Sequence, residues 1–139
     1  MNRYILDTDI LTLFQFGHSA VIQHSRSYPP AMLAVTVITV EEMLTGWYTK
    51  VRRAKTAPHI ARAFGQLTDA VSFLAAVQIQ TFTEPAVLRY EGLRKSFRRM
   101  DKNDLRIAAI VLECGDTLVT RNTKDFQQVP GLRIVDWSK

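Results

Sequence analysis

The chain has 139 residues, the length of one compact domain, which excludes a two-domain enzyme. Hydrophobic residues make up 47% and charged residues 22%, with only 6 Gly and 5 Pro, a composition that excludes a disordered or fibrous protein. The formal net charge of +5 favours a polyanionic partner, and the one cysteine, Cys114, excludes an internal disulfide. We therefore predict a single domain over residues 1–139.

The first third of the chain alternates short apolar runs with polar segments. Tyr4–Leu6 predicts a buried strand that ends at Asp7, and a helix is expected from Leu11 onward. Residues 24–30 are interpreted as a loop. Residues 32–35 form a second apolar run without polar alternation, which is typical of a buried strand in a parallel sheet.

Helical patterns dominate the middle of the chain. The segment Thr39–Glu42 fits a capping box, which predicts the start of a helix that runs to just before Pro58. Apolar residues then recur at three- and four-residue steps over 60–77, as in an amphipathic helix. A short strand is expected over 79–82, and Thr83 is expected to cap the next helix.

The last third predicts a buried helix between two strands. Residues 105–112 are apolar almost all round, with Asp101 as the expected N-cap and Gly115 at the C-terminal end. The final strands are expected at 117–120 and 132–135. Strands that alternate with helices predict an α/β fold with three layers, in which helices cover both faces of a central parallel sheet. Ligands of such sheets bind at the carboxyl ends of the strands.

Four carboxylates are expected where an element meets a loop: Asp7, Glu42, Asp104 and Asp125. Glu42 also fits a purely structural role in the capping box, and Asp104 one at a helix N-terminus. Acidic groups clustered at one edge repel each other unless a cation lies between them. Because oxygen ligands suit a hard divalent ion, a site for Mg²⁺ or Mn²⁺ is the functional alternative.

Four segments resemble the PIN-domain ribonucleases, in particular the VapC-type toxins of bacterial toxin–antitoxin pairs. They are LDTD (6–9), VITVEEMLTG (37–46), NDLRIAAIVLECG (103–115) and TLVTRNTKDFQQVPGLRIVDW (117–137). The resemblance spans nearly the whole chain and implies a PIN-like α/β/α domain. By position, it assigns Asp7, Glu42, Asp104 and Asp125 to the acidic catalytic and metal site of that family.

The resemblance also carries expectations about activity and partners. It implies a Mg²⁺- or Mn²⁺-dependent endoribonuclease that leaves a 5′-phosphate and a 3′-hydroxyl. A cognate antitoxin protein and a homodimer are implied as partners. No apolar run approaches the roughly 20 residues of a membrane span, and Asp7 interrupts any signal-peptide core, so we expect a soluble, cytoplasmic protein without a membrane partner.

Further residues have supporting roles in this interpretation. Thr8, Thr120 and Asn122 are assigned to support the acidic site, with Thr120 and Asn122 expected to orient Asp125, water or phosphate. Asp9 stands where many relatives have Asn, and its role is left open. A basic run that leads into Asp104 is expected to contact the RNA backbone, with a solvated face as the alternative. It comprises Arg94, Lys95, Arg98, Arg99 and Lys102.

Two other functions are weighed against the ribonuclease. Asp7-Thr8-Asp9 at a strand end imitates the nucleophile loop of haloacid-dehalogenase-like phosphotransferases, although Leu11 replaces the usual Thr or Val and the chain is short for that class. A catalytically inactive module that binds RNA or protein is the third candidate, and the four acids speak against it. The sequence does not specify the RNA, its cleavage sequence or the number of metal ions.

Overall fold

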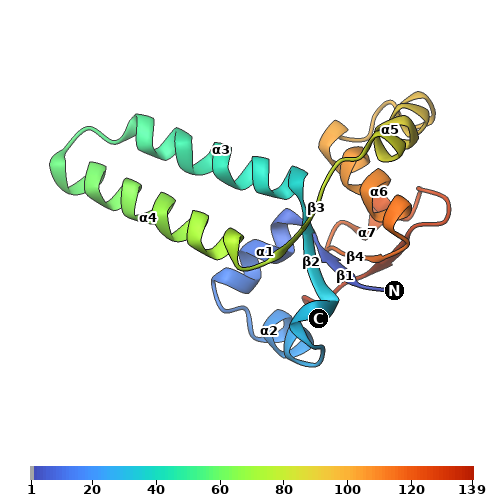
Figure 1. The fold of residues 1–139 in the computed structure, drawn as a ribbon, viewed down its shortest axis with the longest axis horizontal. Helices are drawn as coiled ribbons and strands as arrows, with labels where there is room; N and C mark the ends of the chain where they lie inside the picture. The colour runs from blue at the N-terminus through green and yellow to red at the C-terminus, as the bar shows by residue number, and fades with distance from the viewer. Residues whose placement is uncertain (1) are drawn as a thin grey trace.

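A five-stranded parallel sheet lies at the centre of the computed structural model, which describes residues 2–139 (Figure 1). The strands are Tyr4–Leu6 (β1), Leu33–Thr36 (β2), Gln78–Gln80 (β3), Thr117–Val119 (β4) and Arg133–Val135 (β5), in the spatial order β3-β2-β1-β4-β5. The helices are Thr8–Gln15 (α1), Ser19–Arg26 (α2), Val37–Arg53 (α3), Ala57–Ala75 (α4), Glu84–Ser96 (α5), Lys102–Cys114 (α6) and Thr123–Phe126 (α7). A short 3₁₀ turn, Pro30–Met32, precedes β2.

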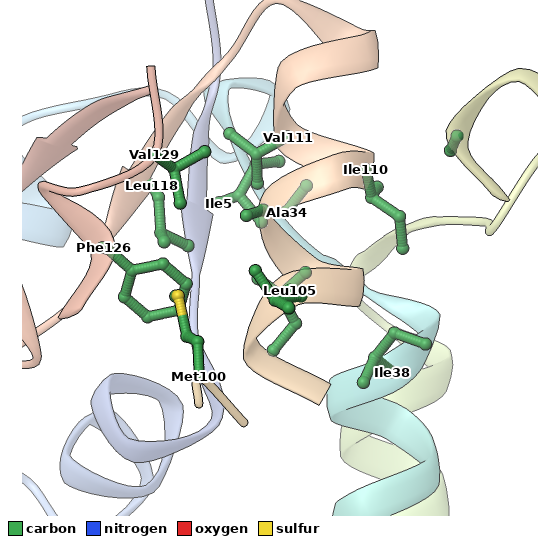
Figure 2. Close-up of a cluster of buried hydrophobic side chains, with 13 residues drawn as sticks. Ile5, Ala34, Ile38, Met100, Leu105, Ile110, Val111, Leu118, Phe126 and Val129 are labelled. Atoms are coloured by element: carbon green, nitrogen blue, oxygen red, sulfur yellow. The ribbon is translucent and has the colours of Figure 1, made fainter. Parts of the chain in front are cut away.

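Consecutive residues of the central strands enter different cores, because side chains alternate between the faces of a sheet. Ile5 and Leu118 join the core formed with α5 and α6, where Leu105 is fully buried (Figure 2). Leu6 and Val119 join the other core, formed with α1, α2 and α4. These two cores confirm the predicted three-layer α/β arrangement with its central parallel sheet.

The helices α3 and α4 form a long hairpin that extends away from the sheet (Figure 1). Two predictions about its first helix were wrong. The N-cap is Thr36, whose hydroxyl accepts from the backbone N–H of Thr39, so Thr39 lies inside the helix. The helix ends at Arg53 rather than just before Pro58, because Thr56 caps a separate helix in which proline is tolerated in the first turn.

Three further local predictions needed correction. The first helix begins at Thr8, directly after β1, and not near Leu11. The expected loop over 24–30 overlaps the end of α2, a helix that the sequence patterns did not indicate. Asp125 lies on the short helix α7 and not in a loop. Each correction concerns a short segment whose apolar pattern is too brief to define a period.

Other predicted helix ends are confirmed. Asp101 caps α6 by accepting the backbone N–H of Asp104 at 3.1 Å, and Thr83 caps α5. Gly115 ends α6 with a φ of +71°, a left-handed conformation that glycine adopts without a steric penalty. Within residues 2–139, none of the helices combines the length and apolar character that crossing a bilayer requires.

Candidate active site

Asp7 lies at the carboxyl end of the central strand β1 and caps helix α1. Its Oδ1 accepts from the backbone N–H of Ile10 at 2.9 Å, while its own N–H donates to the carbonyl of Val119 at 3.0 Å. The residue is only 7% exposed. Asp7 is thus held by one hydrogen bond to helix α1 and by another to the neighbouring strand β4.

Burial raises the pKa of Asp7 from 3.8 to about 6, because the charged form loses hydration there. The nearby charges of Asp9 and Glu42 act in the same direction. Hydrogen bonds from the Thr120 side chain and the Ile10 backbone oppose this rise. Thr120, which was expected to orient Asp125, water or phosphate, is therefore placed against Asp7.

Glu42 approaches the same edge from helix α3. Its Oε1 accepts from the Thr8 hydroxyl at 2.6 Å, and its Oε2 accepts from Asn103 Nδ2 at 3.3 Å. The Thr8 hydroxyl also lies 3.0 Å from that of the buried Thr39. Thr8, a predicted supporting residue, is therefore the link between α1 and the Glu42 carboxylate.

Asp104 and Asp125 are joined through the amide of Asn122. Asn122 Nδ2 lies 3.1 Å from Asp125 Oδ2 and 3.5 Å from Asp104 Oδ2. Burial raises the pKa of Asp104 from 3.8 to about 6, and the charges of Asp101, Asp7, Glu42 and Asp125 add to the rise. The structure thus brings all four predicted carboxylates close enough for their charges to interact.

The chemistry of this acidic edge fits a hard divalent cation, because every donor is an oxygen atom. As the side chains stand, no group of three or more His, Cys, Asp or Glu within the described residues could hold a metal ion. Mg²⁺ is commonly bound through one or two carboxylates and keeps several waters, so it does not require such a group. A cation would also relieve the repulsion that Asp104 experiences.

Asp9 forms an ion pair that the sequence patterns did not predict. Arg121 donates through Nε and Nη2 to its two carboxylate oxygens, at 2.6 and 2.9 Å. Both side chains are about half exposed, at 48% for Arg121 and 50% for Asp9. The pair joins the start of α1 to the segment that carries Thr120 and Asn122.

The predicted basic run divides into residues with different surroundings. Lys95, Arg98 and Arg99 line a hollow that also contains Asp125. Arg94 donates from Nη1 to the carbonyl of Arg98 at 3.0 Å, so it stabilises the chain there. The last member of the run, Lys102, is the exposed first residue of α6 and lies outside this lining.

Asn103 is the main site residue that the sequence reasoning missed. It donates to Glu42 and accepts from Arg106 Nη1 at 2.7 Å, and this guanidinium lies over the Tyr90 ring, 5.1 Å from its centroid. Asn103 lies within the segment that carries the family resemblance, directly before Asp104, which was the available signal. Arg106 lies in the same segment, but Tyr90 carries no such signal, because only packing between α5 and α6 brings its ring to the guanidinium of Arg106.

The chain is similar to known ribonucleases in sequence, although no model of a protein family matches it. It is 29% identical to ribonuclease VapC1 of Haemophilus influenzae strain R2866, over 98% of both chains. It is 25% identical to the tRNA(fMet)-specific endonuclease VapC of Shigella flexneri, over 99% of this chain and 100% of that protein. A toxin–antitoxin complex from Klebsiella pneumoniae contains a similar structure, with a TM-score of 0.72, 25% identity, and coverage of 96% and 97%.

A five-stranded parallel sheet between helical layers, with carboxylates gathered at its carboxyl edge, defines a PIN-like α/β domain. Nothing in the relatives favours the phosphotransferase or the inactive module. The chain is similar in sequence to VapC ribonucleases and in fold to a toxin–antitoxin structure, in agreement with the resemblance that its motifs indicated.

Proposed function

We propose that this protein is a metal-dependent endoribonuclease that hydrolyses RNA at the acidic edge of its sheet. The observation that carries the proposal is the meeting of four carboxylates from distant parts of the chain, with the charges of three of them raising the pKa of Asp104. The similar proteins from H. influenzae and S. flexneri, which are named a ribonuclease and an endonuclease, support the reaction class.

Each residue of the edge has a distinct task in this reaction. Mg²⁺ or Mn²⁺ held by Asp7 and Asp104, with Glu42 and Asp125 beside it, would lower the pKa of a water and stabilise charge on the departing oxygen. Thr8 and Asn103 hold the Glu42 carboxylate in place. The water oxygen bonds to phosphorus as the bond to the 3′ oxygen breaks, and the 3′ oxygen takes a proton. The products are a 5′-phosphate and a 3′-hydroxyl.

Purified protein incubated with total RNA should generate new 5′-phosphate ends in Mg²⁺ or Mn²⁺ and none in EDTA. The physical reason is that four uncompensated carboxylates repel the phosphodiester unless a cation neutralises them. Sequencing of the new 5′ ends measures the reaction and also reports the cleavage sequence. Cleavage at the same rate in EDTA would contradict the metal requirement.

An antitoxin partner is part of the proposal, because the similar Klebsiella structure is a toxin–antitoxin complex. The partner would cover the acidic edge and offer a cation, such as an Arg side chain, to the carboxylates. A cytoplasmic location and a homodimer complete the proposed picture. Sedimentation of the purified chain tests the dimer.

Expression of the wild-type chain alone should arrest growth, because a free endoribonuclease degrades cellular RNA. The Asp104→Asn chain should not arrest growth. Co-expression of the antitoxin, a small protein encoded next to this chain, should relieve the growth arrest caused by the wild type. Growth curves with parallel immunoblots measure the effect at equal protein levels. If the wild-type chain neither slows growth nor cleaves RNA, the toxin function is contradicted.

A further inference from the structure

A hollow of about 410 Å³ lies beside Asp125, between the connection from α5 to α6 and helix α7. This volume is within the range of ligand pockets, about 300–1,000 Å³. We call it the basic hollow, and its lining includes Lys95, Phe97, Arg98, Arg99, Asp125 and Gln128. It is therefore a cationic space that shares one carboxylate with the acidic edge.

The three cations of the basic hollow are free to bind an anion. Among residues 2–139, neither Lys95 nor Arg98 nor Arg99 forms an ion pair with a carboxylate. All three side chains are exposed. Asp125, on the same lining, accepts a hydrogen bond from Asn122 instead. Three neighbouring cations without a carboxylate partner favour a phosphate group, which accepts several charge-assisted hydrogen bonds.

The walls of the basic hollow are anchored in the core. Met100 follows Arg99 directly and is 9% exposed, while Phe126 follows Asp125 and is 1% exposed. Both belong to the same buried cluster (Figure 2). An exposed hydrogen bond from Arg94 to the carbonyl of Arg98 also restrains this connection. The cations are thus carried by backbone that tertiary packing has already ordered, which lowers the entropy cost of binding.

We propose that the basic hollow binds the nucleotide next to the bond that is cut in single-stranded RNA, with Lys95, Arg98 and Arg99 on its phosphate. The proposal rests on the proposed endoribonuclease function and adds where the substrate lies. Asp125 places the hollow beside the acidic edge, because Asn122 connects it to Asp104. Phe97 packs against the buried cluster and also lines the hollow, where its ring offers a stacking surface for the base. Gln128 Nε2 donates to the carbonyl of Asp125, which leaves the side-chain oxygen of Gln128 to accept from the base.

The test compares two triple variants with equal loss of charge. Lys95→Gln/Arg98→Gln/Arg99→Gln removes the hollow's cations, and Arg52→Gln/Arg53→Gln/Lys55→Gln removes exposed cations at the far end of the α3–α4 hairpin (Figure 1). Both are made in Asp7→Asn protein, so that binding is measured without cleavage. The probe is a short, fluorescein-labelled single-stranded RNA of mixed sequence, and anisotropy is recorded over a salt series.

The hollow variant should lose at least about tenfold in affinity, and its slope of log K against log salt should become shallower by about 0.7, since the three cations neutralise one phosphate of a single strand. The hairpin variant should keep the slope of its parent. Equal slopes in the two variants would overturn the proposal. Thermal unfolding of each variant establishes that it is folded.

Photo-crosslinking locates the RNA without any change to the basic hollow. A 4-thiouridine RNA bound to the Asp7→Asn protein should crosslink to the peptide that contains Phe97, and crosslinks confined to other elements would overturn the assignment. If the wild type cleaves RNA but the two triple variants have equal salt slopes, the RNA-binding role of the basic hollow is overturned and the endoribonuclease function stands. Unequal slopes without any cleavage would support the hollow and contradict the proposed function.

Discussion

Asp7→Asn should abolish RNA cleavage and yet make the metal-free protein more stable at pH 8. The cleavage is lost because Asn carries no charge with which to hold a divalent cation at the end of β1. The helix cap is kept, because the Asn side-chain oxygen can still accept the backbone N–H of Ile10, and Asn is as good an N-cap as Asp.

The gain in stability follows from the direction of the pKa shift. Asp7 has a pKa raised from 3.8 to about 6 in the folded protein, so the folded state retains a proton that the unfolded chain loses. The stability contributed by this group is complete below about pH 4 and is lost as the pH rises through 6. For a group only 7% exposed, the loss amounts to up to about 3 kcal/mol in the free energy of unfolding.

Urea unfolding in EDTA, at pH 4 and at pH 8, measures this effect. The Asn variant should exceed the wild type at pH 8 and approach it at pH 4, where the carboxyl of Asp7 is protonated in the folded protein and close to half protonated in the unfolded chain. Asp69→Asn, on the exposed surface of α4, is the matched control and should show no such pH dependence. A variant that is less stable than the wild type at pH 8 would contradict the assigned cause.

Asp104→Asn should remove both RNA cleavage and the stabilisation of the protein by Mg²⁺. A ligand that binds only the folded state raises the free energy of unfolding, by about 2.7 kcal/mol at a hundred times its Kd. Asp104 is the carboxylate at which the charges of Asp7, Glu42 and Asp125 converge, so it is placed to share a cation with them. Its loss should therefore weaken metal binding as well as catalysis.

Thermal unfolding over a Mg²⁺ titration, with cleavage assayed in the same buffers, separates the two effects. The wild type should show a melting temperature that rises with Mg²⁺, and the Asp104→Asn protein should show a flat response. Glu91→Gln, exposed on α5, removes a charge away from the acidic edge and should behave like the wild type. Full cleavage activity in Asp104→Asn would remove this residue from the site.

Local signals in the sequence were sufficient for the elements that carry them. Asp101 and Gly115 determine the two ends of α6 through backbone hydrogen bonding and a left-handed conformation, both of which act over a few residues. The apolar runs of β1 and β2 also carry a local signal. They predicted buried parallel strands, because a strand covered on both faces has no polar alternation.

Tertiary structure decided the elements whose local signals were short or ambiguous. The capping-box pattern predicted that the helix begins at Thr39, whereas the end of β2 places the N-cap at Thr36. Helix α2 has few apolar residues and is held by burial of Val21 and Ser25 in the fold. Helices this short are only marginally stable alone, so their presence depends on packing.

The sequence by itself predicted which carboxylates form the candidate site, because its motifs indicated Asp7, Glu42, Asp104 and Asp125. Only the tertiary structure decided what surrounds them. The order β2-β1-β4 brings the ends of three strands together, although chain order does not fix it. The contact from Asn103 to Glu42, the pairing of Arg121 with Asp9 and the basic hollow all join segments far apart in the chain. Such contacts leave no periodic or local pattern, since they arise from which elements pack side by side.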